Sequence, residues 1–152
     1  MPDVVPAHLR PMIFGINELM MELLYLLQTY SNTDLESLLI LLYVNDATMR
    51  PFMHDQAPSA ELLTTAKPPD SVRGAISRRM IAEKTGLSRE TVRRKTRQLA
   101  KAGLILIDAE DRVRSAQRLD EAEVQRMIEA GHKAITRYMR RLDLYGVDWT
   151  AN

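Results

Sequence analysis

Basic side chains that could bind a polyanion are concentrated in one part of the chain. Residues 71–118 contain thirteen lysines and arginines against five acidic residues, although the formal net charge of all 152 residues is only +1. Clustered cations of this kind suit nucleic acid, because arginine contacts phosphates and donates two parallel hydrogen bonds to guanine. A solvated charged face without a partner has the same composition, so charge alone leaves both interpretations open.

Helical geometry sorts these cations onto defined faces. A helix is predicted from residue 89 to about residue 102, with Ser88 as a typical N-cap. At about 100° per residue, the side expected to be buried contains Val92, Thr96 and Leu99. The opposite side contains Glu90, Arg94, Arg97 and Lys101. Arg93 falls on one flank, beside an outward face that is mainly basic.

The residues before this helix complete the layout of a helix-turn-helix. Ser77 is expected to cap a short helix over residues 78–84, and Gly86 to end it in the left-handed conformation. The small side chain of Ala82 allows two helices to cross closely. The cap at Ser88 leaves N–H groups for phosphate, and in this layout the second helix enters the major groove by its first residues.

Residues 76–105 resemble the helix-turn-helix of the cyclic-AMP receptor protein family, through the run Ser88-Arg89-Glu90-Thr91-Val92 followed by Arg94. The resemblance implies that three residues contact base edges: Arg89, Glu90 and Arg94. It also implies that four residues lie at or near phosphates: Ser77, Arg78, Ser88 and Thr91. Further basic residues are added as candidate phosphate contacts: Arg79, Arg93, Arg97 and Lys101. The N-terminal half shows no resemblance to that family's cyclic-nucleotide-binding domain.

The elements that must hold these residues in place are predicted to be mainly helical. The segments outside the helix-turn-helix are a helix over 9–31, a second helix behind a capping box at Thr33–Glu36, a proline-rich connection over 48–73 and a helix over 119–145. Apolar residues 104–107 and alternating residues 112–114 predict a small wing sheet of two or three strands.

This order of elements resembles the winged-helix bacterial transcription regulators of the MarR type. The resemblance implies a mainly α, winged helix-turn-helix fold in a single domain of residues 1–152, with a DNA-binding lobe over 33–118 and long terminal helices that form a dimer. Arg112 and Arg114 of the wing are expected to reach phosphates or the minor groove. The wing tip is acidic and would be repelled by DNA, so we expect the wing to contribute through these two arginines or to contribute little.

The last predicted helix carries an apolar seam at alternating spacings of four and three residues, which is typical of helices packed lengthwise. The seam consists of Val124, Ile128, Ile135, Tyr138 and Leu142, with Gly131 between them. A partner helix of a second copy is favoured, and packing on the chain's own core is the alternative. The first predicted helix has a wide apolar surface, and Glu18 and Glu22 argue against a membrane-spanning segment.

These observations predict a homodimeric, sequence-specific double-stranded DNA-binding protein, a transcription regulator that reads an inverted repeat through residues 89–102. Two alternatives stay open: a winged-helix module for protein–protein interaction or assembly, and a replication or partition factor. A small apolar effector is left open as a partner, in a cleft near Tyr25, Tyr43 and Phe52.

Enzyme activity is not expected. The chain has no cysteine and three histidines that are far apart in sequence, so no catalytic residues, metal site or cofactor are predicted. A composition of 45% hydrophobic and 27% charged residues argues against a disordered chain or a disulfide scaffold. The N-terminus lacks the features of a signal peptide, so we expect a cytoplasmic protein without a membrane partner.

Overall fold

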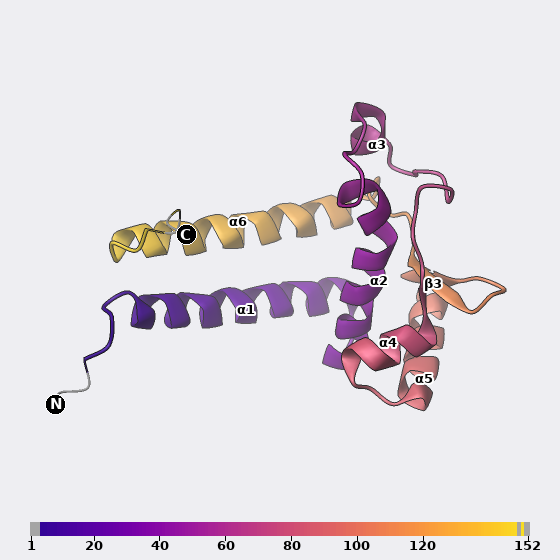
Figure 1. Cartoon of the computed structure of the whole chain (residues 1–152), viewed down its shortest axis with the longest axis horizontal. Helices are drawn as coiled ribbons and strands as arrows, with labels where there is room; N and C mark the ends of the chain where they lie inside the picture. The colour runs from indigo at the N-terminus through magenta and orange to yellow at the C-terminus, as the bar shows by residue number, and fades with distance from the viewer. Residues whose placement is uncertain (1–3, 149, 151–152) are drawn as a thin grey trace. The chain divides into compact units, whose positions relative to one another are not determined.

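Six helices and three short strands form the described part of the chain, residues 4–148 and 150 of a computed structural model (Figure 1). The helices are α1 (Leu9–Ser31), α2 (Leu35–Met53), α3 (Ala60–Thr64), α4 (Arg78–Thr85), α5 (Arg89–Lys101) and α6 (Ala122–Leu144). The strands are β1 (Ile76–Ser77), β2 (Ile105–Ile107) and β3 (Arg112–Ser115). The expected mainly helical fold with a small sheet is confirmed. Among the described residues, no helix has the length and apolar character needed to cross a membrane.

The chain divides into two compact units. One contains α1 and α6, and the other, residues 31–121, contains the remaining elements and is called the lobe below. Within the first unit, α1 and α6 run side by side in opposite directions (Figure 1), and Gly15 packs against the ring of Tyr138. Two ion pairs join these helices: Glu22 with Arg137 and Glu18 with Arg141.

The core of the lobe is built from α2, α4, α5 and the sheet. Its fully buried aliphatic side chains include Ile40, Val44, Ile81, Val92, Leu99, Ile105 and Val113. Burying one such side chain stabilises a fold by about 1.5–3 kcal/mol, so these contacts hold α5 firmly on α2. The face of α5 that the sequence predicts to be buried is confirmed, because Val92, Thr96 and Leu99 are all buried.

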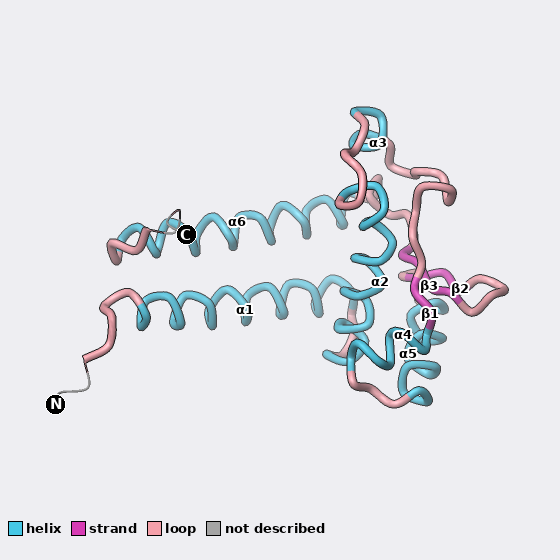
Figure 2. The backbone as a smooth tube through the Cα atoms, viewed as in Figure 1, coloured by secondary structure: helices cyan, strands magenta, loops and turns pink. Residues whose placement is uncertain are grey.

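The three strands form an antiparallel sheet in the order β1–β3–β2 (Figure 2). Ser77 of β1 pairs with Arg112 of β3, and Leu106 of β2 pairs with Arg114 of β3. Because Ser77 also precedes α4 directly, this register places the first turn of α4 beside the start of β3. The loop over residues 108–111 projects beyond the sheet (Figure 2), and it is called the wing tip below.

The N-cap of helix α2 lies one residue later than the sequence predicts. The sequence pattern favours Thr33 as N-cap with Glu36 bonding back to it, and this detail is wrong. Asp34 is the N-cap, and its Oδ1 accepts a hydrogen bond of 2.8 Å from the backbone N–H of Ser37. Lys95 of α5 favours this arrangement, because its Nζ lies 2.6 Å from Asp34 and 3.2 Å from Glu36.

Lys95 is a charged residue on the buried side of α5, with only 5% of its side chain exposed. Its hydrogen bond to Asp34 is the main cause of a raised pKa for the Lys95 ammonium, against the opposing effect of burial. The same hydrogen bond lowers the pKa of the Asp34 carboxyl to about 2. Both groups therefore stay charged near neutral pH, and the ion pair ties α5 to the start of α2.

The proline-rich connection starts later than the sequence predicts, because α2 continues through Pro51. Proline has no N–H to donate to the carbonyl of Ala47, one turn earlier. Gly74 packs directly against this carbonyl and donates its own N–H to the carbonyl of Thr48 at 2.9 Å. The helix therefore tolerates Pro51, because Gly74, where the connection returns to α2, packs against the carbonyl that the proline leaves without a partner.

Side chains of the connection also bind β3 and the segment that follows it. Arg73 is buried, donates a hydrogen bond to the carbonyl of Ser115 and lies 2.9 Å from the carboxylate of Asp70. The side-chain amide of Gln117 donates to the carbonyl of Pro68 at 3.2 Å. The proline-rich connection is therefore anchored to β3 and to the segment after it through both its backbone and its side chains.

Replacing Gly74 with alanine should destabilise the lobe. A Cβ at this position would lie 2.1 Å from the carbonyl oxygen of Ala47, which belongs to the backbone of α2. We expect Gly74→Ala to lower the free energy of unfolding by about 1–3 kcal/mol in urea denaturation. Gly131→Ala is the matched control, because its nearest neighbours lie at 3.8 Å and alanine favours a helix by about 1 kcal/mol. Equal effects of the two substitutions would contradict the close packing.

The Asp34–Lys95 ion pair should make stability depend on acid pH. Asparagine is also a good N-cap, so Asp34→Asn removes only the charge. We expect it to lower the free energy of unfolding by about 0.5–1 kcal/mol at pH 7, a small value because the exposed carboxylate is screened by water. The stabilisation is present above the usual pKa of 3.8 and is lost as the pH falls towards about 2. Urea denaturation from pH 7 to pH 2 should therefore show the variant and the wild type converging. A constant difference across this range would show that the charge contributes nothing.

Candidate nucleic-acid interface

Helices α4 and α5 are joined by a short turn between well-defined ends. Ser77 accepts a hydrogen bond of 3.1 Å from the N–H of Met80, and Ser88 accepts one of 3.1 Å from the N–H of Thr91. Gly86 has a φ of 72°, a left-handed conformation that favours glycine. The predicted caps and turn are confirmed, and they fix where α5 begins and which side chains its first turn presents.

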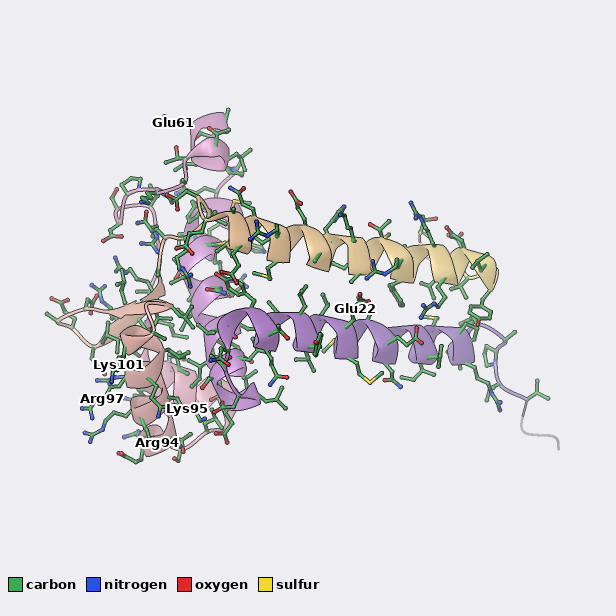
Figure 3. The ribbon with its side chains drawn as sticks, turned by 180° about the vertical axis from the view of Figure 1, so that it is seen from behind. Glu22, Glu61, Arg94, Lys95, Arg97 and Lys101 are labelled. Atoms are coloured by element: carbon green, nitrogen blue, oxygen red, sulfur yellow. The ribbon has the colours of Figure 1, made fainter. Side chains whose placement is uncertain are left out.

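Besides Arg93, which is described below, four basic side chains are exposed along α5: Arg89, Arg94, Arg97 and Lys101. In the described part of the chain, none of them lies within 4.0 Å of a carboxylate. Figure 3 shows Arg94, Arg97 and Lys101 on the outer side of α5, pointing away from the lobe. These four residues are called the α5 cations below, and their charge is not neutralised within the lobe.

Two other exposed basic residues of α4 and α5, Arg79 and Arg93, have acidic partners on the same helix. The Nε atom of Arg93 lies 3.5 Å from the carboxylate of Glu90, and that of Arg79 lies 3.0 Å from Glu83. Exposed pairs of this kind contribute about 0–1 kcal/mol, so a strong external anion can replace them. Glu90, which the resemblance places at a base edge, is held beside Arg93 in the free protein.

The two wing arginines are engaged with carboxylates of the lobe. The Nε atom of Arg112 lies 3.1 Å from Asp108. The side chain of Arg114 is only 14% exposed and lies 3.3 Å from Asp70 and 3.7 Å from Asp108. Its Nε is buried and has no hydrogen-bond partner within the described residues. This placement differs from the expected free side chains, because Asp70 reaches the sheet from the proline-rich connection.

Arg78, the first residue of α4, is also paired, and its partner is Asp111 of the wing tip. The wing tip is held in shape by Asp108, whose carboxylate accepts the backbone N–H groups of Glu110 at 3.0 Å and Arg112 at 2.9 Å. The hydrogen bond from Arg112 is the main cause of the lowered pKa of Asp108. The wing therefore presents fixed negative charges beside the start of α4.

The structural role of Lys95 is not predicted from the sequence. Helical periodicity does indicate that Lys95 lies near the buried side of α5, because it follows Val92 by three residues and lies about 60° from it around the helix. Its partners Asp34 and Glu36 could not be inferred, since they belong to a different helix. Lys95 positions α5 and is not available to an external phosphate (Figure 3).

The predicted seam of α6 is partly covered within a single chain. Val124 and Leu142 are buried and Tyr138 is half-buried, whereas Ile128 and Ile135 are exposed. Several large apolar residues of α1 are exposed as well: Ile13, Phe14, Ile16, Met20, Met21 and Tyr25. The first unit therefore has uncovered apolar side chains on both of its helices.

The predicted effector cleft and the possibility of a metal site remain to be considered. Tyr43 and Phe52 lie on α2 and Tyr25 lies on α1, and an effector near them stays a prediction. The Nζ atom of Lys84 lies 5.9 Å from the centre of the Tyr43 ring. Within the described ranges, no group of three or more histidine or acidic side chains is arranged to hold a metal ion.

Comparison with known proteins gives no match from which a function could be transferred. No protein-family model, no curated protein and no solved structure matches this chain. A function is therefore inferred from the chain's own residues, from their geometry and from their charges.

Proposed function

We propose that this protein is a winged helix-turn-helix transcription regulator that binds double-stranded DNA as a homodimer, with α5 in the major groove. The observation that carries the proposal is the set of α5 cations, which are exposed and have no acidic partner in the described part of the chain. The order of helices and strands in the lobe, with its three-stranded sheet, supports the winged-helix assignment.

The α5 cations repel one another in the free protein. Arg94 and Arg97 are three residues apart, and Arg97 and Lys101 are four apart, spacings at which like charges destabilise a helix by a few tenths of a kcal/mol per pair. Binding to a row of phosphates removes this repulsion and releases counterions from the DNA. Arg89 and Arg94 lie in the half of α5 that would meet base edges, because recognition helices enter the groove by their first residues.

The exposed surface of α5 does not favour a protein-binding module. Among the described residues, the large hydrophobic side chains of this helix, Val92 and Leu99, are both buried. Protein interfaces have apolar or aromatic side chains at their centre and few charges there. The outward side of α5 has the opposite character, which supports a polyanionic partner.

The first unit supports the dimeric part of the proposal. Ile128 and Ile135 lie seven residues apart on the same side of α6, and both are exposed. The apolar side chains of α1 add to this uncovered surface, which is unusual for a monomer in water. A second copy of the chain would cover it and would place two copies of α5 for an inverted repeat, about 34 Å apart on one face of the duplex.

Substituting Arg94 should weaken DNA binding and relax its sequence preference. We expect Arg94→Ala to reduce affinity roughly 10- to 100-fold, the loss typical of a bidentate base contact. The site is first recovered by selection from random duplexes, and affinity is then measured by fluorescence anisotropy at low and physiological salt. Arg140→Ala, which removes one exposed charge from α6, should bind like the wild type.

The proposed function fails if the wild type binds no duplex at low salt, or if the two alanine variants lose affinity equally. A recovered site without two-fold symmetry would contradict the homodimeric reading of DNA. Mapping of the recovered site to promoters, rather than to a replication origin or partition locus, would support transcription regulation.

Placing a charge on the exposed apolar side of α6 should disrupt the dimer. We expect the wild type to sediment at twice the monomer mass of 17.4 kDa and Ile135→Glu to sediment as a monomer at micromolar concentration. Lys133→Glu is the control, because two residues along a helix correspond to about 200°, nearly the opposite side. A wild type that remains monomeric at high concentration would exclude the proposed homodimer.

A further inference from the structure

The wing tip places three carboxylates beside basic residues that would otherwise be free. Asp111 pairs with Arg78, Glu110 lies 3.8 Å from Arg112, and Asp108 lies 3.1 Å from the same guanidinium. The α5 cations are treated differently, since no carboxylate in the described residues lies near them. Acidic groups of the lobe therefore neutralise the basic residues around the sheet and leave the α5 cations without a partner within the described residues.

The Asp111–Arg78 pair follows from the register of the sheet. Ser77 pairs with Arg112, so the next residue, Arg78, emerges beside the residue that precedes Arg112, which is Asp111. The wing tip is closed by backbone hydrogen bonds between Asp108 and Arg112 at 2.9 Å and between Asp111 and Asp108 at 3.1 Å. Asp111 is therefore held beside Arg78 by the backbone before any partner arrives.

Arg78 lies where an external phosphate would also be attracted. It is the first residue of α4, and the unpaired N–H groups of a helix start favour a negative charge. Its side chain is 21% exposed, so it is accessible to solvent although its guanidinium is already paired with a carboxylate. A DNA phosphate that reached Arg78 would have to displace Asp111 and would then lie near the displaced carboxylate.

We propose that Asp111 competes with DNA phosphate for Arg78, so that the wing tip lowers the DNA affinity of the lobe. The inference rests on the proposed function and adds a specific regulatory contact to it. Asp111 takes the place of one phosphate, and the DNA-bound protein therefore makes one phosphate contact fewer per protomer than its basic residues allow. Any change that draws the wing tip away from α4 would raise the affinity for DNA.

Asp111→Asn tests this competition without disturbing the turn. Asp111 has a φ of 64°, and asparagine tolerates this left-handed conformation as well as aspartate does. Loss of the pair should raise DNA affinity roughly two- to fivefold, the range of an exposed ion pair. It should also steepen the dependence of log affinity on log salt by about 0.9 per protomer, the value of one added phosphate contact.

Glu110→Gln is the matched control, because it removes the same charge from the wing tip without touching the partner of Arg78. In the Asp111→Asn background, Arg78→Ala should cancel the gain, because the guanidinium that an added phosphate would contact is then absent. The wild type and all of these variants are measured by anisotropy on the recovered duplex at several salt concentrations, after urea denaturation has shown equal folding.

Three outcomes would overturn the competition. The first is that Asp111→Asn binds with wild-type affinity and salt dependence. The second is that Glu110→Gln binds as tightly as Asp111→Asn, which would indicate a general charge effect. The third is that the gain persists without Arg78. In each of these cases DNA binding that depends on Arg94 leaves the proposed function standing, whereas absence of binding by every variant at low salt overturns both.

Discussion

Helix α5 has six basic residues among thirteen, and it still buries one side against α2. This is possible because the cation that falls beside the buried side, Lys95, is met by Asp34 and Glu36 at the start of α2. Without these carboxylates a charge would be buried unpaired, which is among the more costly arrangements in a protein core. The ion pair therefore allows one helix to be part of the core and to remain strongly basic on its outer side.

The positions of the acidic residues decide which cations are available to a partner. Asp70 and Asp108 hold Arg114 inside the lobe, and Asp111 holds Arg78 beside the sheet. No such carboxylate is near the α5 cations in the described residues. The basic residues around the sheet thus form structural ion pairs, whereas the α5 cations are free within the part of the chain that the structure describes, and composition alone does not distinguish the two sets.

Features that depend on local spacing could be predicted from the sequence. The buried face of α5, its caps and the turn at Gly86 follow from helical periodicity and from residue preferences within a few positions. Features decided by distant partners could not. Thr33 and Asp34 are similar N-cap residues, and the contact of Lys95 with Asp34 favours the second of them. Pro51 indicates the end of a helix, but α2 continues because Gly74 packs against the carbonyl that the proline leaves unpaired.

The same limit explains the wing. Alternation predicts that Arg112 and Arg114 belong to a strand, but their partners depend on the register of the sheet and on where residue 70 returns to it. The sequence alone indicates that the acidic wing tip is unfavourable for DNA. It does not pair Asp111 with Arg78, because that pairing requires β1 and β3 to be neighbours.

Under the proposed function, the paired wing arginines and the exposed apolar side chains of α1 and α6 have a common explanation. A lobe that contacts DNA through one helix makes few phosphate contacts, and each contact adds only a limited, salt-sensitive share of affinity. Joining two lobes makes the second binding event intramolecular and raises the overall affinity without any new contact in either lobe. A protein whose wing arginines are paired within its own fold would therefore depend on dimerisation for useful affinity, and the exposed apolar side chains of α1 and α6 would supply the dimer contact.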